Sequence, residues 1–185
     1  MDSLLGNLLD CYKDHYTPFD EMTYRLMDNV IRCYNQELYD ASVILCRGTI
    51  DSAIYLSCYF EKSQNGDFKI RNPSVLKPNN HVSWEDLRKN AINLKLLNKK
   101  ELDDINKNVR ELGNFAAHIG ERQIKEGNDW IKNCSKYIKA VLQGESTGNI
   151  PENCREGYKI STTINEAESA IKNTIDFLKK LALKC

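Results

Sequence analysis

Proline and glycine are scarce in this chain of 185 residues, which contains four prolines and nine glycines. Both residues interrupt helices, so their scarcity leaves long segments free to form continuous helices. Apart from a short candidate strand at 68–70, no segment shows the period-two alternation typical of β-strands. The sequence therefore predicts an all-α protein, a bundle of four main helices plus one or two extra helices.

An excess of charge and long apolar runs are also missing. Lysine and arginine total 26, as do aspartate and glutamate, so the formal net charge is zero. The chain as a whole therefore does not attract nucleic acid or an anionic membrane, and any polyanion site must be a local patch. No apolar run reaches the roughly 18 residues of a membrane span, and Asp2 stands where a signal peptide carries positive charge. We expect a cytoplasmic protein without a membrane partner.

Recognisable metal-binding and nucleophile motifs are absent. The seven cysteines include no CxxC pair and no cysteine–histidine spacing of zinc type. The sequence contains no nucleophile elbow, HExxH or DxD pattern either, so we expect no metal and no cofactor. Cys33, Cys46 and Cys58 occupy apolar positions of predicted helices, where a reduced cysteine behaves as a small hydrophobe. We therefore expect the cysteines to be free thiols in a reducing compartment.

Capping signals predict where several helices begin. Thr17 as the cap, Pro18 at the first helical position and Asp20 as the following acid predict a helix over about 18–35. Three further starts combine a capping residue with an acid three positions later. These pairs are Ser83 with Asp86, Asn98 with Glu101, and Thr163 with Glu166.

Small residues are frequent in the predicted long helix over about 37–60, which allows a neighbouring helix to approach closely. We expect this helix and the one over about 98–119 to pack centrally against the C-terminal helix. The turn-rich segment 62–82 is expected to be a loop. The predicted organisation is an N-terminal extension over 1–17 and a single domain over 18–185, which has an insertion at about 120–160.

Three polar side chains form a stripe on the predicted 98–119 helix. Arg110, Asn114 and His118 are four residues apart, so they stack on one face. Gly113 and Asn114 both lower the helix propensity of this segment, glycine by about 1 kcal/mol relative to alanine. Something other than local helix stability must therefore account for these two residues at helical positions.

Two interpretations of this polar stripe are open. In the functional one, His118 transfers protons near neutral pH, Arg110 binds phosphate through bidentate contacts, and Asn114 orients the reacting groups. In the structural one, Arg110 pairs with Asp51 or Glu111, Asn114 bonds a neighbouring backbone and His118 caps the helix end.

Two blocks of residues indicate a family. They are Tyr39-x-Ala41-x5-Arg47-x3-Asp51 and Arg110-x-x-Gly113-Asn114-x-x-Ala117-His118. Together with the capped C-terminal helix they resemble the HEPN superfamily of helical bundles. The second block is similar to the Leu-Gly-Asn-x-x-Ala-His signature of a largely uncharacterised prokaryotic branch, often found beside restriction and other defence genes. The resemblance covers about 20–120 and 162–185.

The resemblance implies a metal-independent endoribonuclease of a defence or toxin system. HEPN ribonucleases carry an arginine, usually followed by a polar residue, a few positions before a histidine. Asn114 and His118 match that pattern, but Gly113 stands in the place of the arginine, and the nearest arginine is Arg110. The expected catalytic residues are thus His118, Arg110 and Asn114. Arg47 and Asp51 are expected to support binding or structure, and their i,i+4 spacing also suits an intrahelical ion pair.

The proposed site contains a single histidine per chain, His118, and this bears on the oligomeric state. RNA cleavage needs a base and an acid, and one histidine serves only one of these roles well, so we expect a symmetric homodimer that brings two sites together. The alternative is a non-catalytic HEPN-like module. Such a module would dimerise, bind nucleotide or RNA, or hold a protein partner encoded in a defence operon.

Overall fold

The computed structural model describes residues 6, 8–10, 12, 18–62, 68–70, 82–118, 134, 135, 139, 143 and 162–184. In chain order, the elements are α2 (Pro18–Asn35), α3 (Tyr39–Tyr59), β1 (Phe60–Lys62), β2 (Phe68–Ile70), α4 (Trp84–Asn93), α5 (Lys99–Ile105), the π-helical turn η2 (Asn106–Arg110), α6 (Glu111–Ala117) and α9 (Ile164–Ala182). The strands form a small antiparallel pair. The expected all-α bundle is confirmed, and β2 coincides with the candidate strand.

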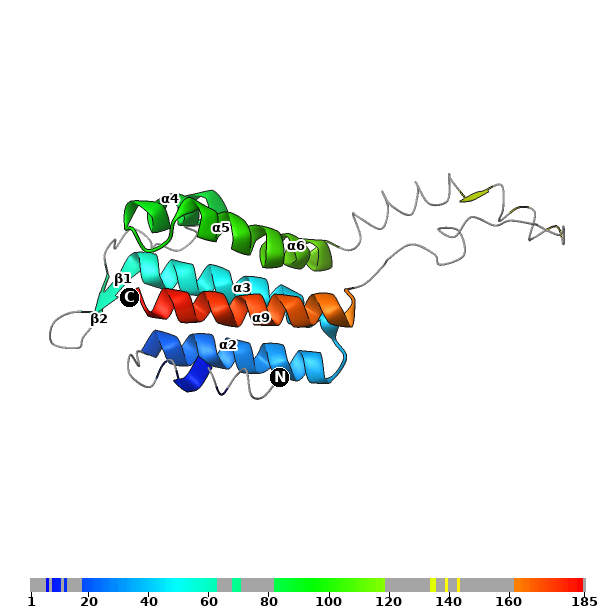
Figure 1. The fold of residues 1–185 in the computed structure, drawn as a ribbon, viewed down its shortest axis with the longest axis horizontal. Coiled ribbons are helices and arrows are strands. Elements are labelled where there is room, and N and C mark those ends of the chain that lie inside the picture. Colours follow the sequence, from blue (N-terminus) through cyan, green and yellow to red (C-terminus); the bar gives the residue numbers. More distant parts are fainter. Residues whose placement is uncertain are drawn as a thin grey trace.

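Helix α3 lies in the middle of the bundle (Figure 1). It contacts α2, α4, α6 and α9, and η2 and α5 also contact α9. The predicted central packing of the 37–60 segment against the C-terminal helix is therefore confirmed, whereas the 98–119 segment lies on one side of the bundle and contacts α9 through α5 and η2. A buried polar side chain of α3 finds its partner within the helix: the Thr49 hydroxyl donates to the Leu45 carbonyl at 2.8 Å. The small residues of α3 thus permit neighbours on several sides without leaving polar groups unpaired.

The three capping boxes expected from the sequence are all present. At Ser83, Asn98 and Thr163, the side chain accepts a hydrogen bond from the backbone N–H three residues later, and the acid there accepts from the backbone N–H of the cap. Glu101 also accepts from the ammonium of Lys184 at 2.7 Å. Lys184 and the Asn98 backbone N–H hold the pKa of Glu101 below its usual range. These contacts join the start of α5 to the end of α9.

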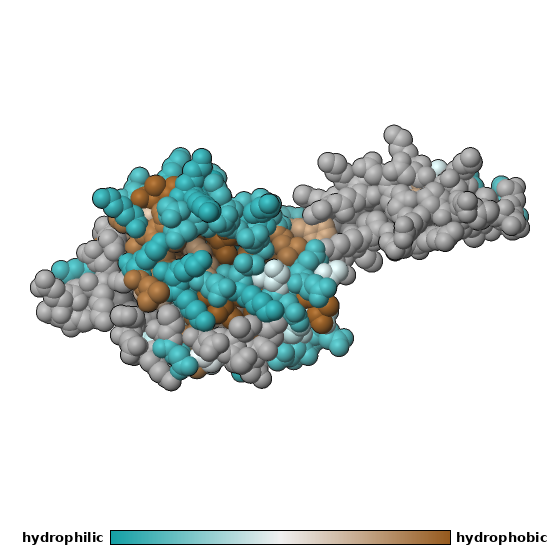
Figure 2. All heavy atoms as spheres, in the orientation of Figure 1, coloured by the Kyte–Doolittle hydropathy of each residue, from teal (hydrophilic) through white to brown (hydrophobic). Residues whose placement is uncertain are grey.

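The surface follows the pattern of an amphipathic bundle. Figure 2 shows hydrophilic residues over most of the described part of this face, with apolar residues in separate small areas. The most exposed large apolar side chains of the described residues are Leu183, Leu38 and Ile164. None of the described helices has the length and apolar composition that a membrane span requires.

The cysteine expectation was partly wrong. Cys33, Cys46 and Cys58 are free thiols, and burial raises the pKa of Cys46 to about 12. Cys134, however, is disulfide-bonded. Core spacing in the sequence shows that a cysteine is buried, but it does not show which second cysteine the fold brings within bonding distance.

Residues from the predicted N-terminal extension take part in the core. Leu8 and Tyr12 are buried, and the Tyr12 hydroxyl lies 3.1 Å from the Thr23 hydroxyl of α2. Most of the 1–17 extension lies outside the described residues, as do nearly all of the 120–160 insertion and most of the 62–82 loop.

Helices α3 and α6 approach closely at Gly113, which is buried. A Cβ atom placed on Gly113 would lie 2.7 Å from the Cβ of Arg47 and 3.2 Å from the Val43 carbonyl oxygen. Any larger residue would therefore force the two helices apart. This close packing explains a glycine that is unfavourable for the helix itself.

We expect Gly113→Ala to lower the free energy of unfolding by about 1–3 kcal/mol, because the added Cβ overpacks the contact between α3 and α6. Gly48→Ala in α3 is the matched control, since its added Cβ meets nothing within 4 Å. That control should raise stability by up to about 1 kcal/mol through helix propensity. Urea unfolding measures both changes, and equal effects at the two sites would contradict the packing explanation.

Candidate functional site

Arg110, the first residue of the polar stripe, points into the bundle. Its side chain is only 7% exposed. Its Nε donates to Oδ1 of Asp51 at 2.7 Å, and its Nη2 donates to Oδ2 at 3.2 Å. This bidentate pair joins the end of η2 to the middle of α3. The pairing with Asp51 that the structural interpretation proposed is present.

The remaining surfaces of Arg110 are occupied as well. Its Nη1 donates to Oδ1 of Asn106 at 3.1 Å, and its Cζ lies 3.8 Å from the centroid of the Trp84 ring. Trp84 is the first residue of α4, so one guanidinium holds three elements together. A phosphate could reach Arg110 only by displacing Asp51 from a hydrogen-bonded ion pair, which is costly in a buried setting.

The π-helical turn η2 places Arg110 in this position. The Glu111 backbone N–H donates to the Asn106 carbonyl, five residues earlier, and the Asn106 amide donates to Oε1 of Glu111 at 3.0 Å. A π turn adds a residue to the helical path and often marks functional sites. Asn106 therefore supports both the turn and Arg110.

Arg47 also lies near the Asp51 carboxylate. Its Nε is 3.8 Å from Oδ2 of Asp51, and its side chain is 31% exposed. The expected i,i+4 pair is present, but at this distance it is an ion pair without a hydrogen bond. Asp51 is thus shared by two arginines, and Arg110 makes both hydrogen bonds.

Asn114 and His118 lie farther along α6. Asn114 is half-buried and His118 is exposed, where it ends the helix with its backbone N–H donating to the Asn114 carbonyl at 3.0 Å. Within the described ranges, neither side chain has a hydrogen-bond partner. The expected helix-end position of His118 is confirmed, whereas the bond from the Asn114 side chain to a neighbouring backbone is not among the described contacts.

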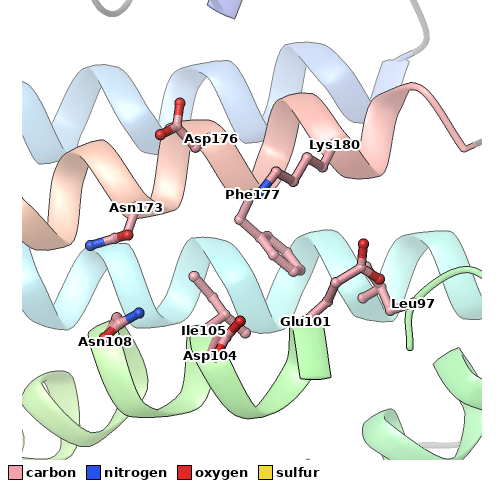
Figure 3. Close-up of a pocket in the computed structure, with 9 residues that line it drawn as sticks. All are labelled: Leu97, Glu101, Asp104, Ile105, Asn108, Asn173, Asp176, Phe177 and Lys180. Atoms are coloured by element: carbon pink, nitrogen blue, oxygen red, sulfur yellow. The ribbon is translucent and has the colours of Figure 1, made fainter. Parts of the chain in front are cut away.

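A separate groove lies between α5, η2 and α9, with a volume of about 130 Å³. Figure 3 shows the side chains that line it: Leu97, Glu101, Asp104, Ile105, Asn108, Asn173, Asp176, Phe177 and Lys180. Three carboxylates against one ammonium disfavour a phosphate ligand here. No group of histidine, cysteine or acidic side chains among the described residues is suited to hold a metal ion. The groove shares no residue with the polar stripe.

Sequence reasoning missed two partners of Arg110. Asn106 stands four residues before Arg110, a spacing that brings side chains together on a helix, so this contact could have been found. Trp84 gave no such signal, because its stacking depends on how α4 crosses the rest of the bundle. The polar stripe is therefore divided between a buried arginine, a half-buried asparagine and an exposed histidine.

We expect Arg110→Ala to lower the free energy of unfolding by about 2–3 kcal/mol, somewhat less than for a fully buried pair because Asp51 is partly exposed. Arg25→Ala is the control, since it breaks the exposed i,i+4 pair with Glu21 and should cost less than about 1 kcal/mol. Urea unfolding of both variants provides the measurement. An Arg110→Ala protein as stable as the control would show that the ion pair of Arg110 with Asp51 contributes little.

Comparison of the chain with protein-family models, with curated proteins and with solved structures finds no match in any of the three.

Proposed function

We propose that the chain is a HEPN-like endoribonuclease that acts as a homodimer and does not need a metal ion. The observation that supports this proposal most directly is the pair of available side chains on α6. His118 is exposed and Asn114 is half-buried, and no described residue bonds either of them. Two polar groups separated by one helical turn, with free hydrogen-bonding capacity, can both contact the same substrate.

The chemistry assigns each group a role. A base removes the proton of the 2′-hydroxyl, whose oxygen attacks the adjacent phosphorus, and an acid protonates the departing 5′-oxygen. The products are a 2′,3′-cyclic phosphate and a 5′-hydroxyl. His118 serves one proton transfer, and Asn114 orients the substrate by hydrogen bonding. The His118 of a second protomer serves the other transfer, and this need for a second histidine is the reason for proposing a homodimer.

Arg110 and Asp51 have a supporting role in this proposal. Their bidentate pair holds η2, and thereby the beginning of α6, against α3. Because Asn114 and His118 follow directly along α6, this attachment sets their position. The resemblance to defence-associated HEPN proteins extends the proposal to a toxin or antiviral role, with RNA as the target.

A second candidate is a non-catalytic HEPN-like module that dimerises or binds RNA, nucleotide or a protein partner. The engagement of Arg110 with Asp51 favours it, because the arginine nearest to the motif is unavailable for transition-state stabilisation. Under this alternative the chain would bind its partner without cutting RNA.

We expect His118→Ala to abolish cleavage of mixed-sequence RNA in the presence of a metal chelator, and Asn114→Ala to reduce it strongly. The melting temperature of His118→Ala should stay close to that of the wild type, because the side chain is exposed. His81→Ala, at a histidine outside both motif blocks, serves as the control for loss of a histidine and should retain activity. Wild-type protein that binds RNA without cutting it would support the non-catalytic module, and cleavage unaffected by His118→Ala would exclude the proposed site.

The homodimer is tested by light scattering at micromolar concentration. We expect a mass about twice the 21.3 kDa of one chain, because a complete site requires two histidines. A mass that corresponds to one chain and does not change when RNA is added would contradict the shared site, whatever the outcome of the cleavage assay.

A further inference from the structure

Two arginines face one carboxylate between α3 and α6. Arg110 uses both oxygens of Asp51 for hydrogen bonds, whereas Arg47 approaches only to 3.8 Å. The nearby carboxylate of Glu111 accepts from the Asn106 amide and forms no ion pair with either arginine among the described contacts. The charge of Arg47 is therefore only weakly compensated, and its five N–H donors have no hydrogen-bond partner in the described part of the chain.

The side chain of Arg47 runs across α6 at the residue that precedes Asn114. A Cβ on Gly113 would lie 2.7 Å from the Arg47 Cβ and 3.2 Å from its Cδ. The bare backbone of Gly113 thus leaves space that the arginine from α3 occupies. His118 lies five residues further along α6, a rise of about 7.5 Å.

We propose that Arg47, rather than Arg110, is the arginine that binds RNA phosphate at this site. The inference rests on the proposed function and names the positively charged side chain that the proposed ribonuclease site requires. Arg47 is partly exposed, carries free donors and packs over Gly113, the residue before Asn114, so it can form a bidentate contact with a phosphate of a strand that passes along α6. Arg110 cannot do so without losing its hydrogen bonds to Asp51. Gly113 stands at the position of the HEPN arginine and has no side chain to supply positive charge. Arg47 of the neighbouring helix α3 supplies that charge instead.

The test compares Arg47→Gln with Arg25→Gln, both made in a His118→Ala background so that RNA is bound and not cut. Glutamine keeps the Cβ, Cγ and Cδ atoms that pack over Gly113 and removes the charge. Affinity for a labelled single-stranded oligoribonucleotide of mixed sequence is measured over a series of salt concentrations. We expect Arg47→Gln to weaken binding about tenfold at low salt and to reduce the salt slope by about one, because one phosphate contact is lost. Arg25→Gln should leave both quantities unchanged.

The possible outcomes separate the two proposals. If the His118→Ala protein binds RNA and Arg47→Gln leaves its affinity and salt slope unchanged, the role of Arg47 is refuted while the proposed function stands. A loss of stability in Arg47→Gln with an unchanged salt slope would assign Arg47 a packing role only. If neither the wild type nor the His118→Ala protein binds or cuts RNA, the proposed function itself fails, and the role of Arg47 fails with it.

Discussion

The ion pair between buried Arg110 and half-buried Asp51 is the interaction on which the central packing depends. One guanidinium hydrogen-bonds both oxygens of a carboxylate on α3, bonds Asn106 in η2 and stacks on Trp84 of α4. A charge this deeply buried is tolerated only when it is paired and hydrogen-bonded, so the geometry of three elements is coupled to it. The turn η2 and the beginning of α6 are positioned by the same contacts.

The three residues of the polar stripe differ in how deeply they are buried. Arg110 is buried because it completes the network, whereas His118 lies at the exposed end of α6, one helical turn beyond the half-buried Asn114. The functional and structural interpretations of the stripe thus apply to different residues. The structural one describes Arg110, and the functional proposal rests on Asn114 and His118. Arg47 lies between these two parts, since it shares Asp51 with Arg110 and packs over Gly113.

Much of the fold could be predicted because its signals are local. Each of the three capping boxes depends on side chains three residues apart, and Pro18 begins α2 as expected for proline at the first helical position. The small residues of α3 correctly indicated close packing with its neighbours. The disulfide at Cys134 was missed, because pairing depends on which residues meet in space and not on spacing along the chain.

The sequence by itself determined the helices, their starts and the candidate residues, since periodicity and capping act within a few positions. Only the tertiary structure decided what those candidates do. The π turn at η2 and the crossing of α4 direct Arg110 toward Asp51 and Trp84, and the approach of α3 to α6 explains Gly113 and packs Arg47 over it. These outcomes depend on how separate helices cross, and a side chain's partners on another helix are not encoded in its own neighbours along the chain.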